Sequence, residues 1–78
     1  MINFYEYSRI FIHEDSPLGD LARDVAEDEN FRELKNTRAD IESYLTARCA
    51  SDGALRAFDA MWRSYLRHLR ASRWIKDI

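Results

Sequence analysis

The sequence predicts an all-α protein: a compact bundle of four helices plus a short turn, closed by a long C-terminal helix. Three observations predict this class. The 78 residues include only two glycines and one proline, and no stretch alternates apolar and polar residues for the length of a strand. Apolar residues recur instead at intervals of three and four, as one face of an α-helix requires. A residue that can cap a helix precedes each such segment.

The first helix is predicted to begin after Asn3 and to run to about Ile12. The Asn3 side chain can cap the first free amides while Glu6 reaches back to the Asn3 amide, which is the capping-box arrangement. Residues 13–15 form a polar break. The side of this helix that faces the core consists of Phe4, Tyr7, Ser8 and Phe11.

The second helix is predicted to start at Ser16-Pro17 and to end near Asp28. Serine accepts a hydrogen bond from a free amide, and a proline in the first position has no amide to leave unpaired. Residues 29–36 form an irregular connection or one short turn, held by Phe31. The buried stripe of the second helix consists of Leu18, Leu21, Ala22 and Val25.

Thr37 and Asp40 predict the cap of a third helix that continues to about Arg48. The chain breaks again at residues 51–53, where Ser51 or Asp52 caps the last and longest helix. We expect that helix to reach about Arg73, with residues 74–78 fraying or folding back. Its buried stripe consists of Leu55, Phe58, Trp62, Tyr65, Leu66 and Leu69.

Size and composition favour one domain over residues 1–78 and a binding module over an enzyme. A chain of 78 residues buries about 60% of the surface of its unfolded form, so a deep pocket would reduce a core that is already small. A single cysteine and the lack of a signal peptide or an apolar span favour a reducing cytoplasm. We expect a cytoplasmic protein without a membrane segment.

Several motifs follow one another in a characteristic order: Phe4-Tyr5-Glu6-Tyr7, Ser16-Pro17-Leu18-Gly19-Asp20-Leu21-Ala22-Arg23-Asp24, Asp28, Phe31, Ile41-Glu42-Ser43-Tyr44-Leu45, and Phe58, Trp62 and Tyr65. Over residues 3–69 the chain is similar to the YozE-like family of small bacterial proteins, which occur in chromosomes and in mobile elements. The resemblance implies a fold like that of the sterile alpha motif (SAM) and no established activity. One departure is Arg32, where the family usually has a proline.

Charge is divided unevenly along the chain. Residues 1–46 hold eleven acids and five bases, a net −6, whereas residues 47–78 hold three acids and seven bases, a net +4. On the last helix four arginines fall within about 60° of one another and away from the apolar stripe. Arg73 lies nearby and Lys76 can extend the patch. This arginine face consists of Arg56, Arg63, Arg67 and Arg70.

The second helix carries the opposite charge, an acidic ridge of residues at helical spacing. Either surface can bind a partner of opposite charge, or it can be a solvated helix face with no partner. Two aromatic residues outside the predicted stripes, Tyr5 and Trp74, are candidate anchors for a partner. The acidic ridge consists of Asp20, Asp24, Glu27 and Asp28.

Catalysis is poorly supported, and we expect no cofactor and no metal. His13 and His68 lack a neighbouring ligand at metal spacing, and Cys49 is a lone cysteine at a helix end. Neither glycine belongs to a phosphate-binding loop. The sequence therefore lacks the common signatures of an enzyme.

Three functions remain. The first is a protein-binding adaptor or inhibitor, which a phage or mobile element could encode. The second is a nucleic-acid-binding module that uses the arginine face. The third is head-to-tail self-association, as in some SAM domains. The net charge of −2 places a protein partner ahead of nucleic acid, because polyanions repel an acidic body.

Overall fold

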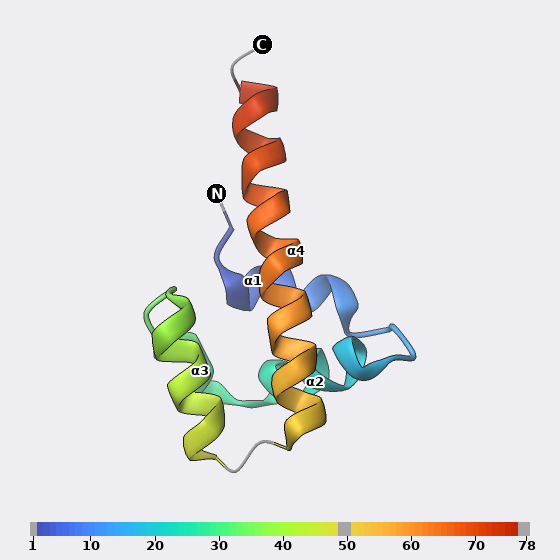
Figure 1. The fold of residues 1–78 in the computed structure, drawn as a ribbon, viewed down its shortest axis with the longest axis vertical. Helices are drawn as coiled ribbons and strands as arrows, with labels where there is room; N and C mark the ends of the chain where they lie inside the picture. Colours follow the sequence, from blue (N-terminus) through green and yellow to red (C-terminus); the bar gives the residue numbers. More distant parts are fainter. Residues whose placement is uncertain (1, 49–50, 77–78) are drawn as a thin grey trace.

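The computed structural model describes the backbone of residues 2–48 and 51–76, and the side chains of residues 2–48 and 51–71. This part of the chain contains four α-helices, two short 3₁₀ helices and no strand (Figure 1). The all-α prediction is confirmed. The elements are α1 (Phe4–Ser8), η1 (Arg9–Phe11), α2 (Pro17–Glu27), η2 (Glu29–Glu33), α3 (Arg38–Ala47) and α4 (Asp52–Lys76).

The predicted caps are confirmed at all four α-helices. In each case a side-chain oxygen accepts a hydrogen bond from an amide three residues later, which satisfies one of the amides that a helix start leaves free. The capping box at α1 is complete, because the Glu6 carboxylate also accepts from the Asn3 amide. The amide donors and their acceptors are Glu6 to Asn3 (2.8 Å), Gly19 to Ser16 (3.2 Å), Asp40 to Thr37 (3.2 Å) and Ala54 to Ser51 (3.1 Å).

Both ends of the chain differ from the expected helix limits. The first helix leaves α-helical geometry after Ser8 and tightens into η1. The Ser8 hydroxyl donates to the Tyr5 carbonyl at 2.7 Å, and such bonds to the preceding turn often bend helices. At the other end, α4 continues as a helix to Lys76, three residues beyond the expected limit.

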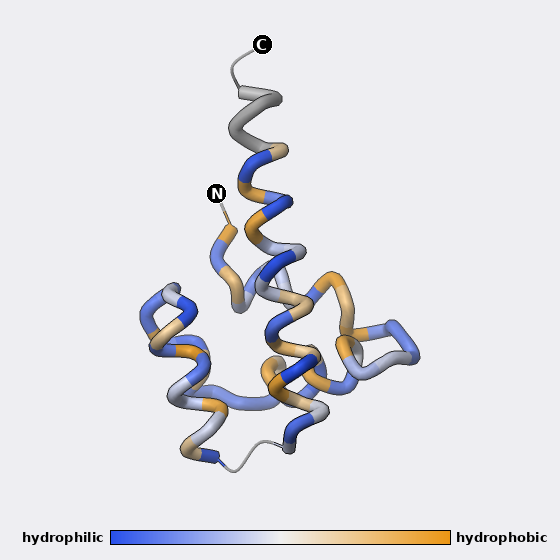
Figure 2. The backbone as a smooth tube through the Cα atoms, in the orientation of Figure 1, coloured by the Kyte–Doolittle hydropathy of each residue, from blue (hydrophilic) through white to orange (hydrophobic). Residues whose placement is uncertain are grey.

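Helix α4 is the axis of the molecule. Its 25 residues correspond to a length of about 37 Å, and the molecule accordingly measures 43 × 27 × 20 Å. Helix α2 packs on one side of its N-terminal half, α3 lies on another, and the C-terminal part stands clear of the other helices (Figure 1). Figure 2 shows apolar and polar residues recurring in turn along this helix.

The core is rich in aromatic residues. Phe4, Phe58 and Met61 are fully enclosed, and α1, α2, η2, α3 and α4 all contribute to the same cluster. The connection over residues 29–36 is held by Phe31, as expected. The buried apolar residues are Phe4, Tyr7, Leu21, Ala22, Val25, Phe31, Ile41, Leu45, Ala57, Phe58, Met61, Trp62 and Tyr65.

One residue of the predicted α4 stripe is exposed. Leu66 is 39% exposed, so its assignment to the buried stripe is wrong. In projection Leu66 lies at the edge of the stripe, about 60° from Arg63 on the same side.

The structure makes one glycine indispensable. A Cβ atom at Gly19 would overlap the backbone carbonyl oxygen of Glu14, because the chain before α2 passes directly over this position. We expect Gly19→Ala to lower the free energy of unfolding by about 1–3 kcal/mol, since the backbone must move. Urea denaturation would measure the loss.

Gly53→Ala is the matched control for this substitution. The nearest atom to its added Cβ is Ser51 Oγ at 3.8 Å, and alanine has the higher helix propensity. We expect unchanged or slightly greater stability. Equal losses in the two variants would contradict the close approach at Gly19.

Candidate functional site

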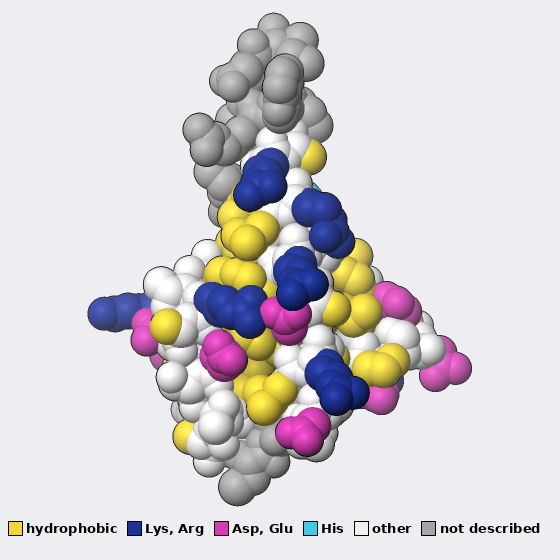
Figure 3. All heavy atoms as spheres, in the orientation of Figure 1, with side chains coloured by type: hydrophobic (Ala, Val, Ile, Leu, Met, Phe, Trp, Pro, Cys, Tyr) yellow, Lys and Arg dark blue, Asp and Glu magenta, His cyan; other side chains and the backbone are white. Residues whose placement is uncertain are grey.

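The arginine face lies on the outer side of α4, where no other described element covers it. Arg56, Arg63, Arg67 and Arg70 are all exposed, and they extend over about 21 Å of helix. Figure 3 shows basic side chains following α4 along this face, with apolar side chains beside them. The backbone of Arg73 belongs to α4, but its side chain is outside the described residues. The structure therefore brings the four predicted arginines together.

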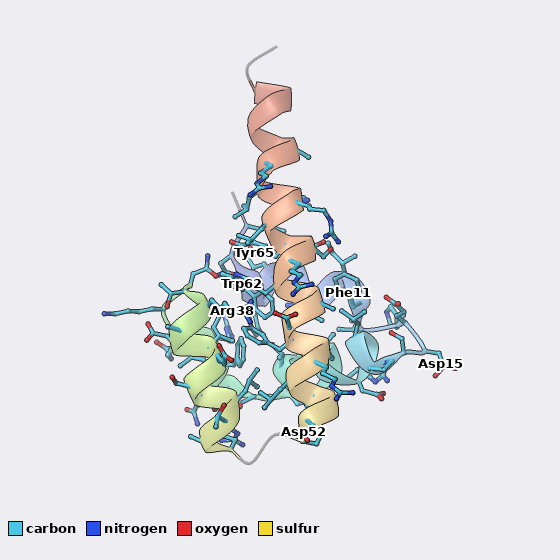
Figure 4. All side chains as sticks on the ribbon, viewed as in Figure 1. Phe11, Asp15, Arg38, Asp52, Trp62 and Tyr65 are labelled. Carbon is cyan, nitrogen blue, oxygen red and sulfur yellow. The ribbon has the colours of Figure 1, made fainter. Side chains whose placement is uncertain are left out.

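A carboxylate lies within this face. Asp59 Oδ2 is 3.2 Å from Arg63 Nη2, and Asp59 Oδ1 accepts a hydrogen bond of 2.8 Å from Arg38 Nη2. The hydrogen bond from Arg38 is the main cause that lowers the pKa of Asp59. Arg38 also lies over the Phe58 ring, 5.7 Å from its centre. Figure 4 labels Arg38 at the end of α3 that lies beside α4.

These contacts divide the arginines into two kinds. Arg63 is partly neutralised by Asp59, although 70% of its side chain remains exposed. Arg56, Arg67 and Arg70 form no salt bridge with any described residue. Their guanidinium groups are available for two-point contacts with carboxylates or phosphates.

The acidic ridge is less uniform than its spacing suggests. Asp20, Asp24 and Glu27 are exposed along α2. Asp20 forms an ion pair with Arg23, and Arg23 also donates to the carbonyl oxygen of Ile12 at 2.8 Å. Asp24 and Glu27 form no salt bridge with a described residue.

Asp28 differs from the rest of the ridge because it is engaged inside the fold. Its side chain is only 16% exposed and lies 3.4 Å from Arg48 Nε. It accepts hydrogen bonds from the Tyr44 hydroxyl at 2.7 Å and from the Asn30 amide at 3.0 Å. Asp28 therefore caps η2 and holds it against α3. The sequence gives no local signal for this cluster, because Tyr44 lies 16 residues away.

A groove lies next to this cluster, between the end of α3 and the first turn of α4. Its volume is about 780 Å³. The apolar side chains at its floor are buried except that of Ala54, and exposed carboxylates stand at the rim. We did not expect this concavity from the sequence. The residues that line it are Leu21, Asp24, Val25, Glu27, Asp28, Glu29, Asn30, Phe31, Leu45, Arg48, Ser51 and Ala54.

The candidate aromatic anchors have different outcomes. Tyr5 is half-buried: its ring centre is 6.3 Å from that of Phe31, and the Arg32 guanidinium lies over it at 5.9 Å. Arg32 thus covers Tyr5. Trp74 belongs to α4, but its side chain is outside the described residues.

The residues considered for catalysis do not converge in the described part of the chain. His13 is exposed after η1, whereas His68 packs against the Tyr7 ring with 5.1 Å between ring centres. Cys49 is outside the described residues. Among the residues that are described, no three His, Cys, Asp or Glu side chains are grouped as metal ligands.

The fold is that of a small helical domain whose charged groups are spread over outer faces. The chain belongs to the YozE SAM-like family: the family model for the YozE SAM-like fold matches residues 3–67. This match confirms both the resemblance and the SAM-like fold. No curated protein and no solved structure gives a significant match. None of the described helices is long and apolar enough to cross a membrane.

The Asp28 cluster predicts a pH dependence. The Tyr44 hydrogen bond, followed by the charge of Arg48, lowers the pKa of Asp28 below its ordinary value of 3.8, against the opposing effect of burial. A lowered pKa in the folded state means that the carboxylate stabilises the fold above pH 3.8. That stabilisation is lost as the pH falls through the lowered pKa.

Tyr44→Phe tests this origin. We expect the substitution to raise the pKa of Asp28 toward its ordinary value and to weaken the acid dependence of the free energy of unfolding. Carboxyl ¹³C titration by NMR would measure the pKa. Asp59, whose pKa is lowered by Arg38, is the internal control and should titrate unchanged. An unaltered Asp28 titration would show that the hydroxyl is not the cause.

Proposed function

We propose that the chain is a non-catalytic protein-binding module, an adaptor or inhibitor, that docks on an acidic partner surface through the arginine face. The observation that carries this proposal is the row of exposed arginines on the outer face of α4, which no other described element covers. Arg56, Arg67 and Arg70 have no salt-bridge partner among the described residues. Arginine is among the residues that contribute most to binding energy at protein interfaces.

The composition of the face favours a protein over a nucleic acid. Asp59, whose side chain is 33% exposed within the row, interrupts the line of positive charge that a continuous phosphate backbone would follow. Leu66 is 39% exposed beside the arginines, and an apolar contact adds little to binding a phosphate backbone. A partner protein that presents carboxylates around an apolar spot matches both features.

We propose that the protein acts in the cytoplasm. The single cysteine of the chain is typical of proteins from reducing compartments. The resemblance implies relatives in mobile elements, which is consistent with an inhibitor that acts on a host protein. The family itself has no established activity, so the proposal rests on the surface of this chain.

Charge reversal tests the proposal. We expect Arg67→Glu combined with Arg70→Glu to abolish capture of the partner in pull-downs from host lysate. Once mass spectrometry identifies that partner, the affinity of the purified pair should fall at least about tenfold, since two attractive contacts become repulsive. Both positions are exposed, so the melting temperature should change little.

Arg9→Glu combined with Lys35→Glu is the matched control. Both positions are exposed and lie outside the arginine face, and the change in net charge is identical. This control should retain the partner. If it loses the partner equally, the interaction depends on overall charge and the arginine face is not the docking surface.

Two further measurements identify the competing functions. A low-salt gel shift with random-sequence DNA or RNA that disappears in the double arginine variant would assign the face to nucleic acid. A molar mass in light scattering that rises with protein concentration and falls with salt would identify a second copy as the partner. We expect neither.

A further inference from the structure

The groove beside the Asp28 cluster combines an apolar floor with an acidic rim. Four elements build it: α2, η2, the end of α3 and the start of α4. Its volume of about 780 Å³ lies within the range of ligand sites in proteins. The residues of the floor are Leu21, Val25, Phe31, Leu45 and Ala54.

The rim carries unbalanced negative charge. Among the described residues, Arg48 is the one basic residue that lines the groove, and it is already paired with Asp28 at 3.4 Å. Its guanidinium also lies over the Tyr44 ring, 5.4 Å from the centre. The other three carboxylates form no salt bridge with a described residue. These exposed groups are Asp24, Glu27 and Glu29.

We propose that this groove binds an arginine- or lysine-bearing segment of a protein partner. The aliphatic stem of such a side chain would lie on the apolar floor, and its cationic head would reach the carboxylates at the rim, as amphipathic side chains do at a boundary between apolar surface and water. The site is separate from the arginine face and selects the opposite charge.

The chemistry of the groove argues for an organic cation. A metal ion would need several oxygen ligands converging on one point, and no such group of three occurs among the described residues. The apolar floor would contribute nothing to an inorganic ion. It would contribute to a side chain that carries both methylene groups and a charge.

The test is a ¹H–¹⁵N NMR titration with a defined probe, the acetylated and amidated pentapeptide Leu-Arg-Leu-Arg-Leu. We expect saturable shifts at the amides of Asp24, Glu27, Asn30 and Ala54, and an affinity that weakens with added salt. The peptide with glutamate in place of arginine should cause no shift at these amides. Shifts of equal size with both peptides would overturn the role of charge.

Glu27→Lys should weaken binding of the arginine peptide at least about tenfold, because it places a cation at the rim. Lysine suits the C-terminal turn of α2, so the fold should be retained. Glu27→Gln, which removes the charge without reversing it, should give a smaller loss. Glu33→Lys is the control: it is exposed, makes the same change in net charge and does not line the groove.

Two outcomes would overturn the proposal. One is an equal loss of affinity in Glu27→Lys and Glu33→Lys, or shifts that do not saturate, since either would show adsorption governed by net charge. The other is that the same amides shift with protein concentration alone, because the groove would then bind a second copy of the chain. Neither outcome depends on the arginine face, so the two proposals can fail separately.

Discussion

The packing of Phe4 beneath α4 is the constraint on which the other contacts depend. The ring is fully buried, and its centre lies 5.3–6.4 Å from those of four other aromatic residues from η2 and α4. The Phe4 amide donates to Asn36 Oδ1 at 2.8 Å, which ties the start of the chain to the segment before α3. The four rings are those of Phe31, Phe58, Trp62 and Tyr65.

This arrangement gives α4 two functions at once. Trp62 and Tyr65 hold it to the core, and Figure 4 shows both on the side of α4 near α1. Because the inward face is fixed, the outward face is presented by a rigid element and not by a loop. The arginines therefore keep their mutual spacing before any partner arrives, which reduces the entropy lost on binding. Asp59 adds to this order by joining Arg38 of α3 to Arg63 of α4.

The sequence predicted the features that arise within a few residues of one another. The caps at Asn3 and Ser16 and the buried stripes depend on local spacing, so periodicity was sufficient to find them. Leu66 was assigned wrongly because it lies at the edge of the stripe, and spacing alone does not show how far around α4 the neighbouring elements reach. The Asp28 cluster and the groove unite residues from four elements, and no local pattern carries that information.

The two charged surfaces both include residues from the first turns of α4 but face away from each other. Ala54 lines the groove and Arg56 begins the arginine face. Residues that lie two positions apart on an α-helix are separated by about 200° around its axis. The two surfaces therefore face almost opposite directions. A partner bound to the arginine face would leave the groove accessible, and both surfaces include residues of the same rigid helix. On the two proposals together, the domain would bind an acidic and a basic partner on opposite sides of α4.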